Sequence, residues 1–121
     1  MAKKRPEIEI RGETAEGIPE GEVIRVPLPD RDNGEMFAIA DEMLGGNHLR
    51  VICEDGKPRL ARIPGRMIKR MWIKVGDLLI IKPWDFQPEK ADVMFRYTRV
   101  QACNLKRKNL LPETIALALE C

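Results

Sequence analysis

The stretch that decides the fold is residues 55–74, which read DGKPRLARIPGRMIKRMWIK. Asp55-Gly56 is a two-residue connection typical of a β-hairpin, because both residues tolerate the positive φ angles that match hairpin twist. The strand that follows, Pro58–Ile63, meets a corner at Pro64-Gly65, and Arg66–Met71 then has the composition of a short helix. The stretch therefore predicts a strand, a corner and a helix in succession.

Further strands are expected on both sides of this stretch. Alternation of apolar and polar residues, or a short uninterrupted apolar run, predicts five strands. They are Met36–Leu44, Asn47–Glu54, Pro58–Ile63, Leu78–Lys82 and Asp92–Thr98. The third breaks strict alternation at Leu60 and Ile63, which predicts a bulge or a sharply bent strand. Five short strands with a small helix between the third and fourth are the layout of the OB-fold barrel, so we predict a mainly β protein of that architecture.

The two ends of the chain are expected to differ from the barrel. Residues 1–22 are rich in Glu, Gly and Pro and predict a flexible tail, after which the OB-fold RNA-binding domain would span residues 23–98. Residues 99–121 predict a helical extension. Thr98 and Gln101 form a capping box for its first helix, and Pro112 opens a second. The apolar run Ile115–Leu119 either docks on the barrel or awaits a partner.

Charge is divided unequally along the chain. Residues 1–56 carry 13 Asp and Glu against 7 Lys and Arg, whereas residues 57–121 carry 6 against 14. From Lys57 to Lys74 there are seven cations and no acidic residue. Lys and Arg that neutralise phosphates release counterions and so gain affinity for a polyanion. The block predicts RNA binding, with a plain solvated face as the alternative.

The candidate RNA-binding residues come mainly from this block. Arg offers a planar two-pronged donor to phosphate, and Lys offers a point charge. Trp72 either stacks on an unpaired base or closes the barrel floor as a core residue. His48 and Arg50 either flank the same surface or belong to an ordinary exposed strand. The full set is Arg59, Arg62, Arg66, Lys69, Arg70, Trp72, Lys74, His48 and Arg50.

Other classes of function find little support in the residues. Three scattered cysteines and a single histidine predict neither a disulfide framework nor a zinc site, and favour a reducing cytoplasm. The apolar runs are far shorter than the ~20 residues that cross a bilayer, and an apolar signal core is missing from the N-terminus. Walker, Gly-x-Ser-x-Gly and His-Glu-x-x-His motifs are absent from the sequence. We expect a cytoplasmic monomer that is not an enzyme and needs no cofactor or metal.

A set of residues in and beyond the basic block resembles a known family. The set is Asp55-Gly56, Arg59, Arg62–Met67, Lys69-Arg70, Trp72-Ile73, Gly76-Asp77, Lys82–Trp84, Lys90–Val93 and Tyr97. Over about residues 20–112 the chain looks like archaeal translation initiation factor 1A and its eukaryotic counterpart. The short tails, without the acidic C-terminal run of the eukaryotic members, favour the archaeal branch.

This resemblance implies an OB-fold protein that binds the small ribosomal subunit at the decoding (A) site. It also implies promotion of initiator-tRNA and messenger-RNA recruitment together with other initiation factors. Two further binding classes remain open on the residues alone. One is a general single-stranded nucleic-acid-binding OB-fold protein or RNA chaperone, and the other is an interaction module whose basic face meets an acidic protein.

Overall fold

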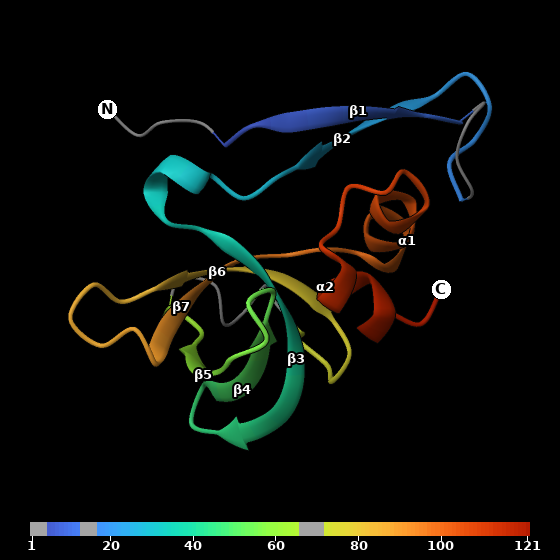
Figure 1. The fold of residues 1–121 in the computed structure, drawn as a ribbon. Helices are drawn as coiled ribbons and strands as arrows, with labels where there is room; N and C mark the ends of the chain where they lie inside the picture. The colour runs from blue at the N-terminus through green and yellow to red at the C-terminus, as the bar shows by residue number, and fades with distance from the viewer. Residues whose placement is uncertain (1–4, 13–16, 66–71) are drawn as a thin grey trace.

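The computed structural model describes residues 5–12, 17–65 and 72–121. Its elements are β1 (Glu7–Arg11), β2 (Val23–Pro27), the 3-10 turn η2 (Arg31–Asn33), β3 (Met36–Gly45), β4 (His48–Cys53), β5 (Pro58–Arg62), β6 (Leu78–Pro83), β7 (Lys90–Arg96), α1 (Arg99–Arg107) and α2 (Glu113–Ala118). Strands β3 to β7 form a closed barrel in the order β3-β4-β5-β7-β6 (Figure 1). Neighbours are antiparallel except β5 and β7, which are parallel.

The predicted five-stranded barrel is thereby confirmed, and each strand lies within about two residues of its predicted range. The short helix predicted at Arg66–Met71 lies outside the described residues. Of the two alternatives for the third strand, the bulge is wrong, because β5 pairs with β4 and with β7 without a register shift, and the sharply bent strand stays a prediction. Shifts occur instead in β3, between Ala40 and Glu42 and between Met43 and Gly45, where the strand bends around the barrel.

The barrel interior combines small and large side chains. Alanines from three strands and larger aliphatic residues from the others form one buried cluster, each at most 1% exposed. Its members include Ala38, Ala40, Ala61, Ala91, Leu49, Val51, Leu79 and Ile81. Alternation of small and large residues lets a narrow barrel close around a core of ordinary packing density.

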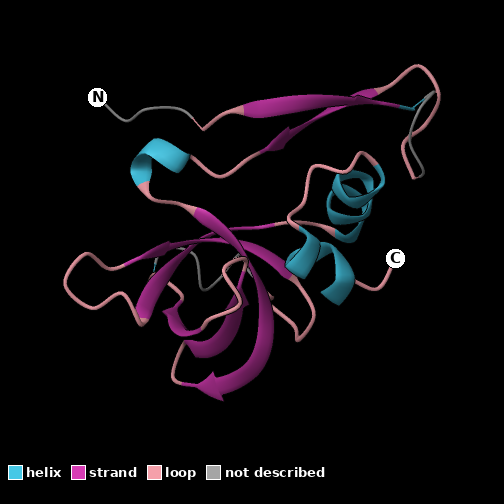
Figure 2. Ribbon diagram, viewed as in Figure 1, coloured by secondary structure: helices cyan, strands magenta, loops and turns pink. Residues whose placement is uncertain are grey.

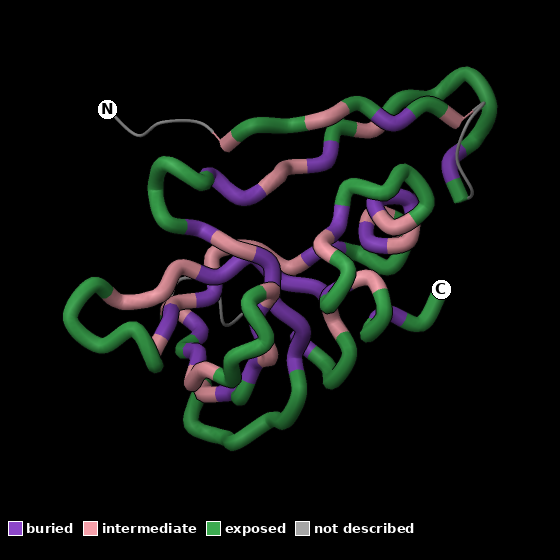
Figure 3. The backbone as a smooth tube through the Cα atoms, viewed as in Figure 1, coloured by how far each residue is buried: buried purple, intermediate pink, exposed green. Residues whose placement is uncertain are grey.

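A second apolar core lies outside the barrel, between its wall, the β1–β2 hairpin and the two helices (Figure 3). Outward-facing residues of β3 and β6 pack there against residues of the hairpin and helices. The largest contributors include Phe37, Leu78, Ile80, Ile10, Val26, Leu105 and Ile115. Strand β6 is therefore buried on both faces, which explains its uninterrupted apolar sequence.

The N-terminal region contains a strand that the sequence does not predict. Glu7–Arg11, within the expected flexible tail, pairs antiparallel with β2, and Ile10 is fully buried. Arg5 forms two hydrogen bonds with the carboxylate of Glu35, at 2.7 and 3.1 Å. Burial alone would raise the pKa of Glu35, but hydrogen bonds from Arg5, the Asp30 N–H and Asn33 outweigh it and hold the pKa below its ordinary value. These contacts hold residues 5–11 against the domain.

The C-terminal helices follow the predicted signals. Thr98 and Gln101 form the expected capping box at the start of α1. Ile115 of α2 is 1% exposed, so this run docks on the domain, although Leu117 is 78% exposed. Although the scattered cysteines predict no disulfide framework, Cys103 on α1 forms a disulfide with Cys121. Folding of α2 against α1 brings these two residues, 18 positions apart, to a Cα–Cα distance of 5.6 Å. No helix of the described residues is long and apolar enough to span a bilayer.

Candidate nucleic-acid interface

The outer face of β4, β5 and β7 gathers cationic side chains from separate parts of the sequence. His48 on β4 lies opposite Arg62 on β5, and Arg50 lies opposite Leu60, which in turn lies opposite Lys90 on β7. Directly opposed residues in a sheet point to the same face. The structure thus brings His48 and Arg50 beside Arg62, as one of the two interpretations of these residues requires.

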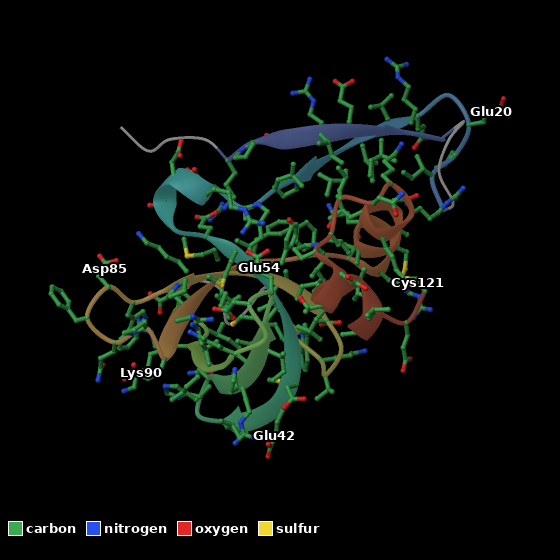
Figure 4. All side chains as sticks on the ribbon, in the orientation of Figure 1. Glu20, Glu42, Glu54, Asp85, Lys90 and Cys121 are labelled. Atoms are coloured by element: carbon green, nitrogen blue, oxygen red, sulfur yellow. A yellow bond between two sulfur atoms is a disulfide. The ribbon has the colours of Figure 1, made fainter. Side chains whose placement is uncertain are left out.

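Two of these arginines are exposed and carry a carboxylate partner. Arg50 donates to Glu42 at 2.7 Å, and Arg62 donates to Asp92 at 3.2 Å. About half of each arginine side chain is exposed, and Glu42 lies near the tip of β3 (Figure 4). Exposed ion pairs contribute only about 0–1 kcal/mol. A phosphate group can therefore replace either carboxylate at little cost.

Arg59 has a different environment from the other predicted site residues. Its side chain is only 9% exposed. It donates two hydrogen bonds to Asp55, at 3.1 and 3.0 Å, and a third to the Pro88 carbonyl at 2.7 Å. The hydrogen bond from Arg59 lowers the pKa of the Asp55 carboxyl. Arg59 thus joins the β4–β5 turn to the β6–β7 loop, and few of its donors remain for RNA.

The acid-free block in the sequence is consequently not acid-free in space. Asp55 precedes the block in the chain and Asp92 follows it, yet both contact its arginines. The hairpin brings the first carboxylate into contact, and the parallel pairing of β5 with β7 brings the second. A count of charges along the chain therefore overstates the excess of positive charge around these arginines in the folded protein.

Trp72 and Lys74 lie on the segment that enters β6. Trp72 is 80% exposed, so the interpretation of this residue as a core side chain is wrong. Ile73 between them is 8% exposed and anchors the segment in the barrel core. The Lys74 N–H donates to the Asp77 side chain at 2.8 Å, and the Asp77 N–H returns a bond to the Lys74 carbonyl at 3.0 Å. A buried anchor and a tight turn thus hold an indole and an ammonium group in solvent.

The remaining predicted residues, Arg66, Lys69 and Arg70, lie outside the described residues, and their contacts with RNA stay a prediction. The sequence places them between the exposed Arg62 and the exposed Trp72. The described residues on either side of the three, Arg62 before them and Trp72 after them, therefore present side chains suited to RNA.

The structure adds to this surface an aromatic side chain, that of Trp84, which the sequence does not predict as an RNA-binding residue. Trp84, at the end of β6, has Arg62 Cζ 5.6 Å and Lys90 Nζ 5.5 Å from its ring centre. Cations at this distance are attracted by the ring face. Because Trp84 follows a strand and opens a loop, only the register of β6 and β7 reveals that it lies beside Arg62.

A groove of about 680 Å³ separates the barrel wall from the two helices. Lys74, Arg96 and Arg99 line it together with apolar residues such as Ile39 and Ile115.

Within the described ranges, no group of three or more His, Cys, Asp and Glu side chains is arranged to hold a metal ion.

The closed five-stranded barrel, with cations on the outer face of β4, β5 and β7 and an exposed indole on the segment that enters β6, defines an OB-fold protein with the features of a nucleic-acid-binding class. Residues 24–120 match the model of the family described as "Translation initiation factor 1A / IF-1". The chain is 60% identical over 91 residues to translation initiation factor 1A of Thermoplasma acidophilum. The aligned residues cover 75% of this chain and 76% of that protein. It is 53% identical over 92 residues to the Archaeoglobus fulgidus factor, and these residues cover 76% of this chain and 95% of that factor.

A comparison of folds gives a more distant similarity. The solution structure of translation initiation factor 1 from the Wolbachia endosymbiont of Brugia malayi matches 54% of this chain and 78% of its own, with 16% identity and a TM-score of 0.43. The sequence matches are the decisive ones. The chain belongs to the translation initiation factor 1A family, and its role is in translation initiation.

Proposed function

We propose that the chain binds the RNA of the small ribosomal subunit at the decoding (A) site and promotes recruitment of initiator tRNA and messenger RNA. In this proposal it acts in the cytoplasm as a monomer, without a cofactor, and contacts initiator tRNA and other initiation factors directly or through the subunit. Membership of the initiation factor 1A family supports the choice of target.

The observation that carries the proposal is the exposure of Trp72 beside Lys74. An indole that is 80% exposed contributes little to the core, yet the buried Ile73 holds it in place. Stacking of an unpaired base on an aromatic ring is worth about 1–3 kcal/mol. An ammonium group two residues away adds a phosphate contact whose strength depends on salt.

The cations of β4 and β5 supply further candidate phosphate contacts on the barrel. Arg50 and Arg62 already hold an oxygen ligand in the form of a carboxylate. A phosphate oxygen accepts the same N–H donors and, with two prongs of the guanidinium, gives a stronger charge-assisted pair. The surface is thus organised for an anion before RNA arrives, which limits the entropy lost on binding. A folded domain held at the A site in this way would exclude other ligands by steric overlap.

The alternative is a general single-stranded nucleic-acid-binding protein or RNA chaperone. Exposed aromatic and cationic side chains on an OB-fold barrel favour it, because such surfaces bind single strands without sequence preference. The two functions differ in their preferred target. A general binder prefers an unstructured oligonucleotide, whereas an A-site factor prefers the folded small subunit.

Chemical footprinting of small-subunit RNA, with and without the protein, tests the proposal. Purified archaeal small subunits are the target, and an unstructured oligonucleotide of mixed sequence is the competitor. We expect protection of decoding-site bases that persists in an excess of competitor. Protection that is scattered, or that the oligonucleotide abolishes, would favour the general single-strand binder. A shallow dependence of binding on salt would count against RNA, because the release of condensed counterions makes phosphate binding fall steeply with salt.

A further inference from the structure

The loop between β6 and β7, residues 84–89, presents an aromatic side chain entirely to solvent. Phe86 at its tip is 98% exposed, the highest value among the large apolar side chains of the described residues. In Figure 2 the loop projects from the barrel at the left of the view, whereas α1 and α2 lie at the right. It is thus well separated from the apolar core that the helices cover.

Hydrogen bonds on several sides hold this loop in one conformation. The Trp84 N–H donates to the Lys90 carbonyl at 2.9 Å, and the Lys90 N–H donates to the Gln87 carbonyl at 2.8 Å. From β5, Arg59 donates to the Pro88 carbonyl at 2.7 Å. A loop ordered in advance loses little conformational entropy when its tip is buried by a partner. An exposed phenylalanine on such a loop has the character of an interface anchor, since aromatic residues are enriched in interface centres.

The charges of the loop indicate the chemistry of the partner. Asp85 and Glu89 flank Phe86, and both are exposed. Neither forms an ion pair with another described residue, whereas the acids beside Arg50, Arg59 and Arg62 all do. Carboxylates on both sides of an aromatic tip repel phosphate and attract Lys and Arg. The tip is therefore unsuited to RNA, in contrast to the segment that carries Trp72.

We propose that the β6–β7 loop docks on a basic protein of the small ribosomal subunit. Phe86 enters an apolar pocket of that protein, and Lys or Arg side chains at the pocket rim pair with Asp85 and Glu89. This inference rests on the proposed function, because it places the chain on the small subunit. It adds a second contact of different chemistry, so that one part of the barrel grips RNA while the loop fixes orientation through a protein.

Site-specific photocrosslinking on purified archaeal small subunits tests this. A benzophenone amino acid replaces Phe86 in one variant and Trp72 in another, and each adduct is digested separately with nuclease and protease. We expect the adduct from position 86 to be a ribosomal protein of basic composition, and the adduct from position 72 to be RNA. An RNA adduct from position 86, or none while position 72 gives RNA, would overturn the docking proposal alone. Failure of the wild-type chain to bind subunits would overturn the proposed function and this inference together.

Affinity measurements provide an independent check that does not depend on crosslinking yield. Phe86→Ala is expected to weaken binding to whole small subunits about tenfold, as loss of an interface anchor does. It should leave binding to protein-free small-subunit RNA unchanged. Leu117→Ala, at an exposed apolar position on α2, is the matched control and should change neither value. Equal weakening by Phe86→Ala with subunits and with protein-free RNA would overturn the docking proposal.

Discussion

The guanidinium carbon of Arg62 lies 5.6 Å from the centre of the Trp84 ring, while Arg62 Nε donates to Asp92. The arginine therefore has an aromatic face on one side and a carboxylate on another. This arrangement fixes the direction of a side chain that is still half exposed. Its charge is available to a phosphate only after the carboxylate is displaced, so the acid acts as an internal competitor.

Removal of that competitor is expected to strengthen RNA binding. Asp92→Asn keeps the shape of the side chain but removes the charge that holds Arg62. Because exposed ion pairs are worth about 0.2–1 kcal/mol, we expect the dissociation constant for small-subunit RNA to fall by a factor of about 1.4 to 5. Fluorescence anisotropy at fixed salt measures it. Glu42→Gln frees Arg50 in the same way and should strengthen binding by a similar factor, whereas weaker binding by Asp92→Asn would remove Arg62 from the interface.

Trp72 is expected to contribute to affinity and not to stability. The side chain is 80% exposed, so Trp72→Ala should leave the melting temperature unchanged. The same change should weaken binding to small-subunit RNA by about 1–3 kcal/mol, the range found for base stacking. Trp72→Phe keeps a ring and should recover most of the loss. If Trp72→Ala lowers stability but not affinity, the indole has a structural role instead.

The sequence predicts the barrel well because the barrel depends on local patterns. Alternation in Asn47–Glu54, the Asp55-Gly56 turn and the capping residues of α1 each determine an element within a few residues. Strand β1 lacks such a signal. It offers only Ile8 and Ile10 between solvent-facing glutamates, and its partner strand lies more than ten residues further along the chain. Non-local pairing is therefore what the sequence reading misses.

The same reason explains which parts of the candidate site the sequence misses. The disulfide of Cys103 joins residues that only the packing of two helices brings together. Trp84 belongs to a strand end whose neighbour, Arg62, lies on another strand. The engagement of Arg59 is different, since its partner Asp55 is four residues away across a hairpin that the sequence predicts. The spacing of four residues across this hairpin is by itself a signal for the pair.

Arg59 is expected to contribute to stability more than to RNA affinity. Arg59→Ala removes hydrogen bonds to Asp55 and to the Pro88 carbonyl, and the side chain is only 9% exposed. Loss of hydrogen bonds from a charged donor costs about 1.5–3 kcal/mol, which urea denaturation can measure. Arg50→Ala, at an exposed pair, should cost less than about 1 kcal/mol. A large loss of affinity for small-subunit RNA in folded Arg59→Ala protein would show that Arg59 contacts the RNA after all.

Stability should fall in acid through two carboxylates. The pKa of Glu35 and that of Asp55 are both lower in the folded protein than their ordinary values of 4.5 and 3.8. The unfolded chain therefore binds more protons below those values, so the stabilisation is fully present above them and is lost as the pH falls through the folded pKa values. Urea midpoints between pH 7 and pH 3 should show this decline. In Glu35→Gln the urea midpoint should fall less steeply between pH 7 and pH 3. A fall as steep as that of the wild type would show that the Arg5–Glu35 pair has no such role.

The Cys103–Cys121 disulfide is expected to stabilise the C-terminal region. It closes a loop across 18 residues, and a cross-link of about this span stabilises a protein by about 2–3 kcal/mol, mainly through the unfolded chain. Cys121→Ser should lower the free energy of unfolding by that amount, and dithiothreitol should do the same to the wild type. Cys53 is buried, which raises the pKa of its thiol, so it should not exchange with the pair. Dithiothreitol should therefore have no effect on Cys121→Ser, and hydrogen exchange should place the loss in α2. Equal stability of oxidised and reduced wild-type protein would show that packing of Ile115 and Leu119 alone holds the helix.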